Sequence, residues 1–412
     1  MGNAFLLLVA SSSILASAEG FVPARLERVE RLIQGRVDRG ELPGGVVLLA
    51  RRGKVGLVRA FGWADVESKR PMKPDDLFRL ASATKILTSA ALLTLYEEGR
   101  FRLRDPVGDY VPELKDLKLQ APDGSIRPLE TKLTIRDLLR HTSGFGYGFR
   151  EPQQSAYRRV GILGPGPDFD WTHPWTLSEW AARLATVPLA DEPGTRFDYG
   201  LGSDVAGLLI ERISNQRLDR FLRERLFAPL GMNDTGFVVP EEKLDRLTSV
   251  YLARESGLEV LDRAPTSAMR VQPKAPSGGG GWDMLGNGGL VSTVPDMLRF
   301  LQMLLNRGEI EGTRVLSRST VEMMFRNHLT GLPAPEISPG VGFGFGYAVV
   351  EDAVKHGEAV SEGMMWWAGS TNVHYWLDPK EEFLGLYFTQ VLPFGHLDMM
   401  DVVRRLSLQA LE

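Results

Sequence analysis

Strand-like patterns in this chain occur near its two ends and are scarce in the long stretch between them. Near the N-terminus, the runs 46–50 and 55–60 flank a turn that contains Gly53, which predicts a β-hairpin. Toward the C-terminus, three runs have the same β-branched and aromatic character: residues 343–350, 373–377 and 383–388. The economical prediction is one antiparallel sheet built from both ends of the chain.

Helical patterns fill the middle of the chain and flank the predicted strands. Residues 101–285 hold helical segments separated by Pro- and Gly-rich loops, and patterns at 23–39 and 396–411 place one helix near each end. A length of 412 residues exceeds what one hydrophobic core usually serves. We therefore expect an α+β fold with a sheet domain, residues 21–100 plus 286–412, and a mostly helical domain between them.

The first twenty residues are apolar and end in the small-residue pattern Ala16-Ser17-Ala18. This pattern is typical of a secretory signal peptide with its cleavage site. The run lacks the usual preceding Lys or Arg, so an N-terminal helix or extension is the alternative. We expect a periplasmic or secreted protein if residues 1–18 are a signal peptide, and a cytoplasmic protein otherwise. No later segment is long and apolar enough to span a membrane.

Charge and composition argue against several classes of partner and cofactor. The net charge is −4, and Lys and Arg are spread along the chain, so nucleic acid is not an expected partner. Cysteine is absent, which excludes disulfides and thiolate metal sites. The six histidines lack the i, i+4 spacing of a helical zinc site, and no nucleotide-binding glycine loop is present. We therefore expect no metal and no cofactor.

A serine and a lysine three residues apart stand at the start of the strongest predicted helix, residues 83–98. Helical spacing places Ser82 and Lys85 one turn apart on the same face. A lysine amine whose pKa is lowered by its surroundings can take the proton of a serine and make it a nucleophile. The S-x-x-K pattern arises by chance about once in a chain of this length, so its place at a helix start is what favours Ser82 as the nucleophile.

These residues resemble the serine β-lactamases and penicillin-binding proteins, which carry an S-x-x-K element and a later K-T-G element. The resemblance is greatest to class C β-lactamases and family VIII carboxylesterases, and it extends over nearly the whole chain from about residue 22. It implies a β-lactamase/transpeptidase-like fold. The tyrosine motif of these families matches Tyr199-Gly200-Leu201, just before a predicted helix. The resemblance implies that Tyr199 and Lys85 handle the proton together, with no single base assigned.

The third family element matches residues 367–372, with the sequence Trp-Ala-Gly-Ser-Thr-Asn. In the family, this strand lines the active site and supplies one N–H group of the oxyanion hole. The resemblance implies that the N–H groups of Ser370 and Ser82 are the two donors, which would stabilise a tetrahedral intermediate. It also implies that Trp367, Ala368 and Gly369 line the substrate site.

Departures from the family motifs bear on the substrate. The K-T-G lysine offers a cation to a substrate carboxylate, and Trp367 cannot do so. Leu201 stands where the tyrosine motif usually has an asparagine amide. Both changes leave a more apolar cleft. Nearby aromatic residues are candidates for an acyl pocket, although such clusters more often belong to a core: Phe145, Tyr147, Phe149 and Trp366.

The sequence thus predicts a carboxylesterase that hydrolyses short-chain esters through a serine acyl-enzyme, with a small-molecule ester as its partner. One alternative is an acyltransferase, because Arg79–Lys85 and Tyr199-Gly200 also resemble segments of lovastatin-type acyltransferases. A β-lactamase or D-amino-acid peptidase is another, disfavoured by Trp367 and Leu201. A non-enzymatic binding protein with this fold would be expected to lose Ser82 or Lys85, and both are present. The oligomeric state is not predicted.

Overall fold

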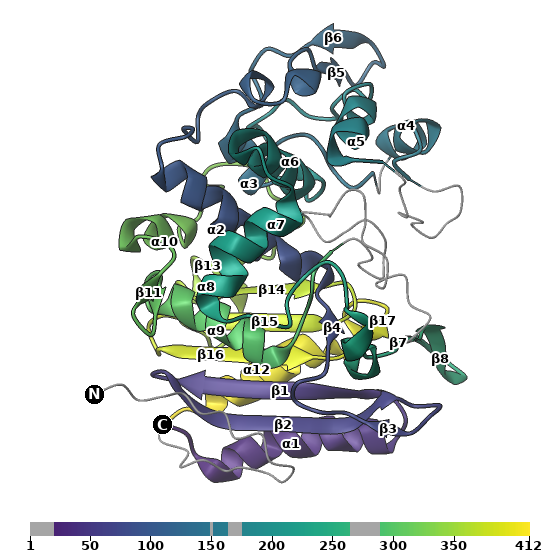
Figure 1. Cartoon of the computed structure of the whole chain (residues 1–412), viewed down its shortest axis with the longest axis vertical. Helices are drawn as coiled ribbons and strands as arrows, with labels where there is room; N and C mark the ends of the chain where they lie inside the picture. Colours follow the sequence, from purple (N-terminus) through teal and green to yellow (C-terminus); the bar gives the residue numbers. More distant parts are fainter. Residues whose placement is uncertain (1–19, 149–150, 164–174, 264–288) are drawn as a thin grey trace.

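The main feature of the computed structural model is an antiparallel sheet of eight strands in the order β12-β13-β14-β15-β16-β1-β2-β3 (Figure 1). Strand β1 from the N-terminal part pairs with β16 from the C-terminal part, with Val46 opposite Phe388. The prediction of one antiparallel sheet drawn from both chain ends is therefore confirmed. The strands are β1 Gly44–Arg51, β2 Lys54–Asp65, β3 Arg70–Pro71, β12 Val341–Phe343, β13 Ala348–Val350, β14 Met365–Gly369, β15 Val373–Asp378 and β16 Phe383–Phe388.

The structure describes residues 20–148, 151–163, 175–263 and 289–412. The segment expected to be a signal peptide and Phe149 lie outside these ranges. Within them, no helix is both long enough and apolar enough to cross a membrane.

Each face of the sheet is covered by helices because the strands alternate their side chains between two apolar layers. The terminal helices α1 (Pro23–Asp38) and α12 (Met399–Gln409) pack on one face, against side chains such as Val47. Helices α2 (Thr84–Glu97) and α9 (Val294–Leu305) pack on the other, against side chains such as Val46. Helix α2 is buried along almost its whole length.

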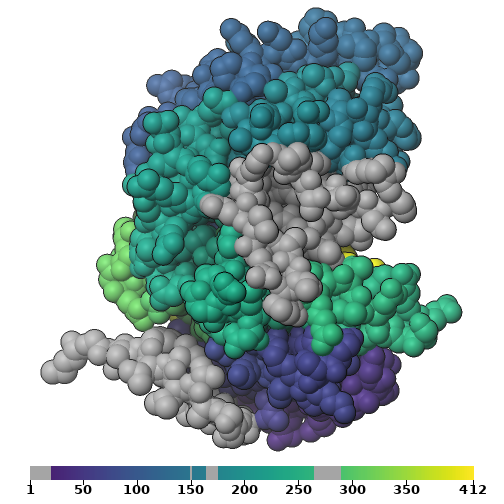
Figure 2. Space-filling view, turned by 45° about the vertical axis from the view of Figure 1, so that its right-hand side comes forward, coloured from purple at the N-terminus to yellow at the C-terminus, as the bar shows by residue number. Residues whose placement is uncertain are grey.

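The helical region lies beyond this second layer, at the upper end of the molecule in Figure 1. Figure 2 shows its blue-to-teal surface above the purple N-terminal strands. Its longest helix packs against α2. The helices outside the sheet layers are α3 Ile135–Leu139, α4 Gln153–Arg159, α5 Leu177–Leu184, α6 Gly202–Ser214, α7 Leu218–Leu222, α8 Ala228–Leu230, α10 Arg318–Met324 and α11 Ala353–His356.

Two segments depart from the predicted pattern. The run 343–350 is divided between β12 and β13, because Gly346 has φ +103° and the chain turns back between them. Residues 250–262, in the region predicted to be mostly helical, form a hairpin that pairs with β17. The smaller sheets contain β4 Phe78–Arg79, β5 Lys118–Gln120, β6 Ile126–Pro128, β7 Val250–Arg254, β8 Gly257–Asp262, β9 Val291–Ser292, β10 Glu309–Ile310, β11 Thr313–Arg314 and β17 Val391–Leu392.

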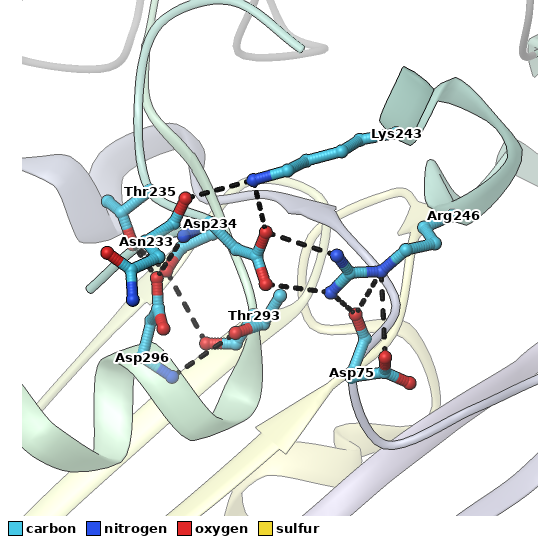
Figure 3. A network of polar contacts seen from close by, with 9 residues as sticks. Asp75, Asn233, Asp234, Thr235, Lys243, Arg246, Thr293 and Asp296 are labelled. Carbon is cyan, nitrogen blue, oxygen red and sulfur yellow. Dashed lines mark hydrogen bonds and ion pairs between the residues drawn. The ribbon is translucent and has the colours of Figure 1, made fainter. Parts of the chain in front are cut away.

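A polar network ties the chain after α8 to the start of α9 and to the loop before β4 (Figure 3). The Asp296 carboxylate accepts hydrogen bonds from the Asp234 N–H and the Thr235 hydroxyl, both at 2.8 Å. Arg246 pairs with Asp234 at 2.9 Å and also donates to the carbonyl of Asp75. Because β4 follows this loop, the network holds the segment that leads into Ser82.

Candidate active site

Ser82 lies in a single 3-10 turn, Ala81–Ala83, between β4 and helix α2. Its neighbours Ala81 and Ala83 are buried, whereas Ser82 is partly exposed. Ala81 has φ +46°, a left-handed conformation that is uncommon for a residue with a side chain. Such strain persists only where the surrounding structure enforces it. The buried helix and the turn together present the Ser82 hydroxyl at the N-terminal end of α2, where the helix dipole favours negative charge.

Among the described residues, the Lys85 ammonium donates two hydrogen bonds within the site. Nζ donates to Ser82 Oγ at 3.0 Å and to Tyr147 Oη at 2.8 Å. The Lys85 side chain is fully buried, and Tyr147 is 7% exposed. Lys85 thus links the predicted nucleophile to a phenol on a separate loop.

Charge on the surrounding groups outweighs burial in setting the ionisation of Lys85. Burial disfavours the ammonium, whereas negative charge on the phenols of Tyr147 and Tyr199 favours it. With the buried carboxylate of Asp204, these groups prevail and raise the pKa of Lys85 above its usual value, a shift opposite to the lowering that a lysine base requires. Burial also raises the pKa of Tyr147, against the opposing effect of the ammonium. The Lys85 amine and the Tyr147 phenol therefore titrate as a coupled pair.

Tyr199 contacts Lys85 through its ring. Nζ lies 4.9 Å from the centroid of that ring, in cation–π geometry. The Tyr199 hydroxyl accepts a hydrogen bond from the indole Nε1–H of Trp367 at 3.1 Å. The predicted proton-handling pair is therefore adjacent in space, but the phenol that hydrogen-bonds to Lys85 is Tyr147.

The backbone on both sides of Tyr199 is held by His141. The Asp198 N–H donates to the His141 carbonyl at 2.8 Å, and the Gly200 N–H donates to Nδ1 of the imidazole at 3.3 Å. Burial lowers the pKa of His141 well below its usual value, with a smaller contribution from Lys85. The imidazole is therefore neutral, and because the Gly200 N–H donates to Nδ1, that nitrogen is the one without a proton.

Strand β14 directs Trp367 toward Tyr199 and Trp366 to the opposite face of the sheet. The Trp367 ring lies 5.2 Å from the ring of Tyr199. Trp366 packs in the layer under α12, where the Arg404 guanidinium lies 4.9 Å from its ring. Because side chains alternate along a strand, Ala368 shares the face of Trp366. Trp366 therefore packs in a core, the alternative given for these aromatic residues, and Ala368 would line the site with its backbone.

The two segments that hold the predicted oxyanion donors are closely packed against each other. A Cβ atom built on Gly369 would lie 2.2 Å from the carbonyl oxygen of Leu80. Only glycine permits this approach, which brings the end of β14 against the turn that holds Ser82. Ser370 follows immediately, so both predicted donors stand where these two segments meet.

The remaining predicted site residues differ in exposure. Phe145 is 1% exposed and packs in the main core, and its expected place in the pocket wall stays a prediction. Its carbonyl accepts a hydrogen bond from the N–H of Leu201, which is also buried. Tyr147 was expected only as a lining residue, and its contact with Lys85 was not predicted. The glycines at 146 and 148 mark this loop as conformationally unusual: Gly148 has φ +70°.

Comparison with known proteins places these observations in a family. The family model described as Beta-lactamase matches residues 29–409. Esterase EstB from Burkholderia gladioli is 33% identical over 360 residues, which cover 85% of this chain and 86% of that protein.

Solved structures agree in fold over nearly the whole chain. EstCE1, described as a hydrolase with promiscuous acyltransferase activity, superposes with a TM-score of 0.77 and 28% identity, covering 94% of this chain and 98% of that one. A simvastatin synthase variant (LovD6) from Aspergillus terreus gives a TM-score of 0.76 and 25% identity, covering 95% and 98%. The predicted β-lactamase/transpeptidase-like fold is confirmed. With its full-length family match and its esterase relative, this chain belongs to the beta-lactamase family and is a serine hydrolase of that fold.

Proposed function

We propose that this protein is a carboxylesterase that hydrolyses short-chain carboxylic esters through an acyl-enzyme on Ser82. The observation that carries the proposal is the placement of the buried Lys85 amine, 3.0 Å from Ser82 Oγ and 2.8 Å from Tyr147 Oη. These distances are within the range over which a proton passes between hydrogen-bonded groups, so Lys85 and Tyr147 together can receive the proton of Ser82.

In the first half-reaction, Ser82 Oγ bonds to the ester carbonyl carbon. Its proton passes to the group formed by Lys85, Tyr147 and Tyr199. This group has already lost one proton before the attack and can therefore accept one. The carbonyl oxygen becomes an oxyanion and accepts hydrogen bonds from the backbone N–H groups of Ser82 and Ser370. When the carbonyl re-forms, the C–O bond to the alcohol breaks, and the same group returns the proton to the leaving oxygen.

In the second half-reaction, water takes the place of the alcohol. The same group accepts a proton from the water as its oxygen bonds to the acyl carbon, and it returns the proton to Ser82 Oγ when the acid leaves. The same oxyanion donors serve both halves, because each half passes through a tetrahedral intermediate.

The side chains of Trp367 and Leu201 support an uncharged substrate. Trp367 offers an indole N–H that is already directed to Tyr199, and it carries no charge for a substrate carboxylate. Leu201 is buried and presents no amide. The name of the relative EstB also supports an ester substrate.

The second candidate is an acyltransferase, in which an alcohol replaces water in the second half-reaction. The names of two structural neighbours favour it, since one is a hydrolase with promiscuous acyltransferase activity and the other a simvastatin synthase. Both candidates share the acyl-enzyme, so product analysis with an added alcohol acceptor distinguishes them.

The deciding experiment compares the purified protein on p-nitrophenyl butyrate and on nitrocefin. Strong ester turnover with little nitrocefin opening is the expected result. Preferential opening of nitrocefin would replace the esterase proposal with a β-lactamase. A fluorophosphonate probe should label Ser82 in the same preparation, and absence of labelling together with absence of turnover would favour a binding protein.

A further inference from the structure

A buried carboxamide joins the segment before Ser82 to the segment after Ser370. It belongs to Gln390, which follows β16 and is 1% exposed. Its Oε1 accepts a hydrogen bond from the backbone N–H of Arg79 at 3.1 Å. Its Nε2 donates to the backbone carbonyl of the same residue at 3.2 Å. One side chain thus pairs with both backbone groups of Arg79, as a neighbouring strand would.

The hydroxyl of Thr371 completes this arrangement. It donates to the Arg79 carbonyl at 3.2 Å and accepts from Gln390 Nε2 at 3.0 Å. Thr371 is fully buried, and so is Arg79. We call Arg79, Thr371 and Gln390 the amide clamp. Buried polar groups are costly to leave unpaired, so each member restricts the positions of the other two.

The amide clamp lies next to both predicted oxyanion donors in the sequence. Ser370 directly precedes Thr371, and Ser82 follows Arg79 by three residues in a tight turn. Gly369 packs against the carbonyl of Leu80 between these points. The clamp therefore fixes the spacing of the two chain segments from which the N–H groups project.

We propose that Gln390 and Thr371 are positioning residues that set the separation of the two oxyanion-hole N–H groups. This inference rests on the proposed acyl-enzyme function. Neither side chain touches the reacting atoms, so each acts through the backbone. Displacing a donor by a fraction of an ångström weakens its hydrogen bond to the transition state more than to the ground-state ester. The clamp should therefore affect kcat more than KM.

The test uses a pair of substitutions at Thr371 in the full-length protein. Thr371→Val keeps the shape and removes the hydroxyl, whereas Thr371→Ser keeps the hydroxyl. Removing an oxyanion donor costs about 100-fold to 1000-fold in kcat, so displacing one should cost less, about tenfold. We expect Thr371→Val to lower kcat on p-nitrophenyl butyrate by about tenfold with KM within about twofold. Thr371→Ser should recover most of that loss.

Thr389→Val is the matched control. The Thr389 hydroxyl is also fully buried and donates to a backbone carbonyl, that of Gly44 at 2.6 Å. The Thr389 carbonyl accepts from Gln390 Nε2 at 2.9 Å, and the valine variant keeps this backbone group. Its removal should lower the melting temperature by an amount similar to Thr371→Val while leaving kcat near the wild-type value. Rates are divided by the concentration of sites that react with a fluorophosphonate. Unfolded protein in the sample therefore does not lower the measured kcat.

A second readout depends on the oxyanion itself. A thionoester develops charge on sulfur, which is larger than oxygen and a weaker hydrogen-bond acceptor. The ratio of kcat/KM for an ester to that for its thionoester should fall in Thr371→Val and in Gln390→Met, and should be unchanged in Thr389→Val. A purely structural role for the clamp would leave this ratio constant.

Several outcomes overturn the inference. Wild-type kcat in Thr371→Val would do so, as would equal losses in the valine and serine variants. A loss that disappears after normalisation to labelled sites would show a folding role alone. These results differ from a failure of the proposed function, in which the wild-type protein itself turns over no ester or Ser82→Ala remains active.

Discussion

Tyr147 is the phenol in direct hydrogen-bond contact with Lys85, at 2.8 Å. We predict that Tyr147→Phe lowers kcat on p-nitrophenyl butyrate by about 100-fold, in the range of a lost general acid–base group. The ring remains, so the packing of the loop and KM should change little. Steady-state kinetics of the purified variant measure both quantities.

Tyr157→Phe provides the control for Tyr147→Phe. Tyr157 is fully buried in the same core, and within the described part of the chain its hydroxyl has no hydrogen-bond partner. Its loss should leave kcat unchanged. A Tyr147→Phe variant as active as Tyr157→Phe would mean that Tyr199 and Lys85 move the proton without Tyr147.

Trp367 has a chemical role in the structure, because its indole N–H donates to the Tyr199 hydroxyl. This bond holds the Tyr199 phenol beside the Lys85 ammonium. Trp367→Phe should therefore lower kcat by about tenfold, the effect of losing one hydrogen bond. The same substitution at Trp366, on the opposite face of β14, should change stability and not kcat. Equal kinetic effects at both positions would assign Trp367 to packing alone.

At the residue scale, the contact between Ser82 and Lys85 can be predicted from the sequence, because it is local. The contact between Lys85 and Tyr147 cannot, because it depends on residues that are distant in the sequence. The first pair is three residues apart at a helix start, so helical periodicity brings the side chains together. The loop that carries Tyr147 takes its path from distant bonds, such as that between the Asp198 N–H and the His141 carbonyl. Sequence spacing contains no information on such a bond.

At the scale of elements, the start of α9 carries a buried acid within the network of Figure 3. Burial raises the pKa of Asp296 from 3.8 to about 6, and the hydrogen bonds from Thr235 and Asp234 oppose this effect only partly. The folded protein therefore holds a proton that the unfolded chain releases between about pH 4 and pH 6. Stability from this group is fully present below that window and is lost as the pH rises through it.

Asp296→Asn should abolish this pH dependence. The amide oxygen can still accept from the Thr235 hydroxyl, and no buried charge forms at high pH. We expect the free energy of unfolding of the variant to exceed that of the wild type at pH 7.5, by at most about 3 kcal/mol. Urea unfolding at pH 4, 5, 6 and 7.5 measures the difference. A gap between the two proteins that stays constant across this range would show that Asp296 is ionised in the folded state throughout.

Among the elements, the central sheet is predictable from sequence and the β7–β8 hairpin is not. Strands β1 and β16 have dense β-branched and aromatic runs, so their type is clear from composition alone. Strands β7 and β8 are short, and much of β8 is exposed. The parallel pairing of β7 with β17 connects residues about 140 positions apart, as between Tyr251 and Val391. A window along the sequence cannot detect such a pairing.

At the scale of the whole molecule, one hydrophobic cluster extends through both regions that the sequence divides. It contains Leu386 of the sheet, Leu87 of α2 and Leu208 of the helical region, all fully buried. Helix α2 packs against α6, so the helix that begins at Ser82 is part of the contact between the regions. A shared core implies that neither region buries its apolar surface without the other.

We therefore predict that the protein unfolds in a single cooperative transition. Leu386→Ala in the sheet and Leu208→Ala in the helical region should each destabilise the protein by about 2–5 kcal/mol, the cost of a cavity in a core. Because the core is shared, each variant should shift the same transition, seen alike by far-ultraviolet circular dichroism, tryptophan fluorescence and loss of ester turnover. Two separate transitions, with each variant moving only one, would instead establish residues 101–285 as an independently stable unit.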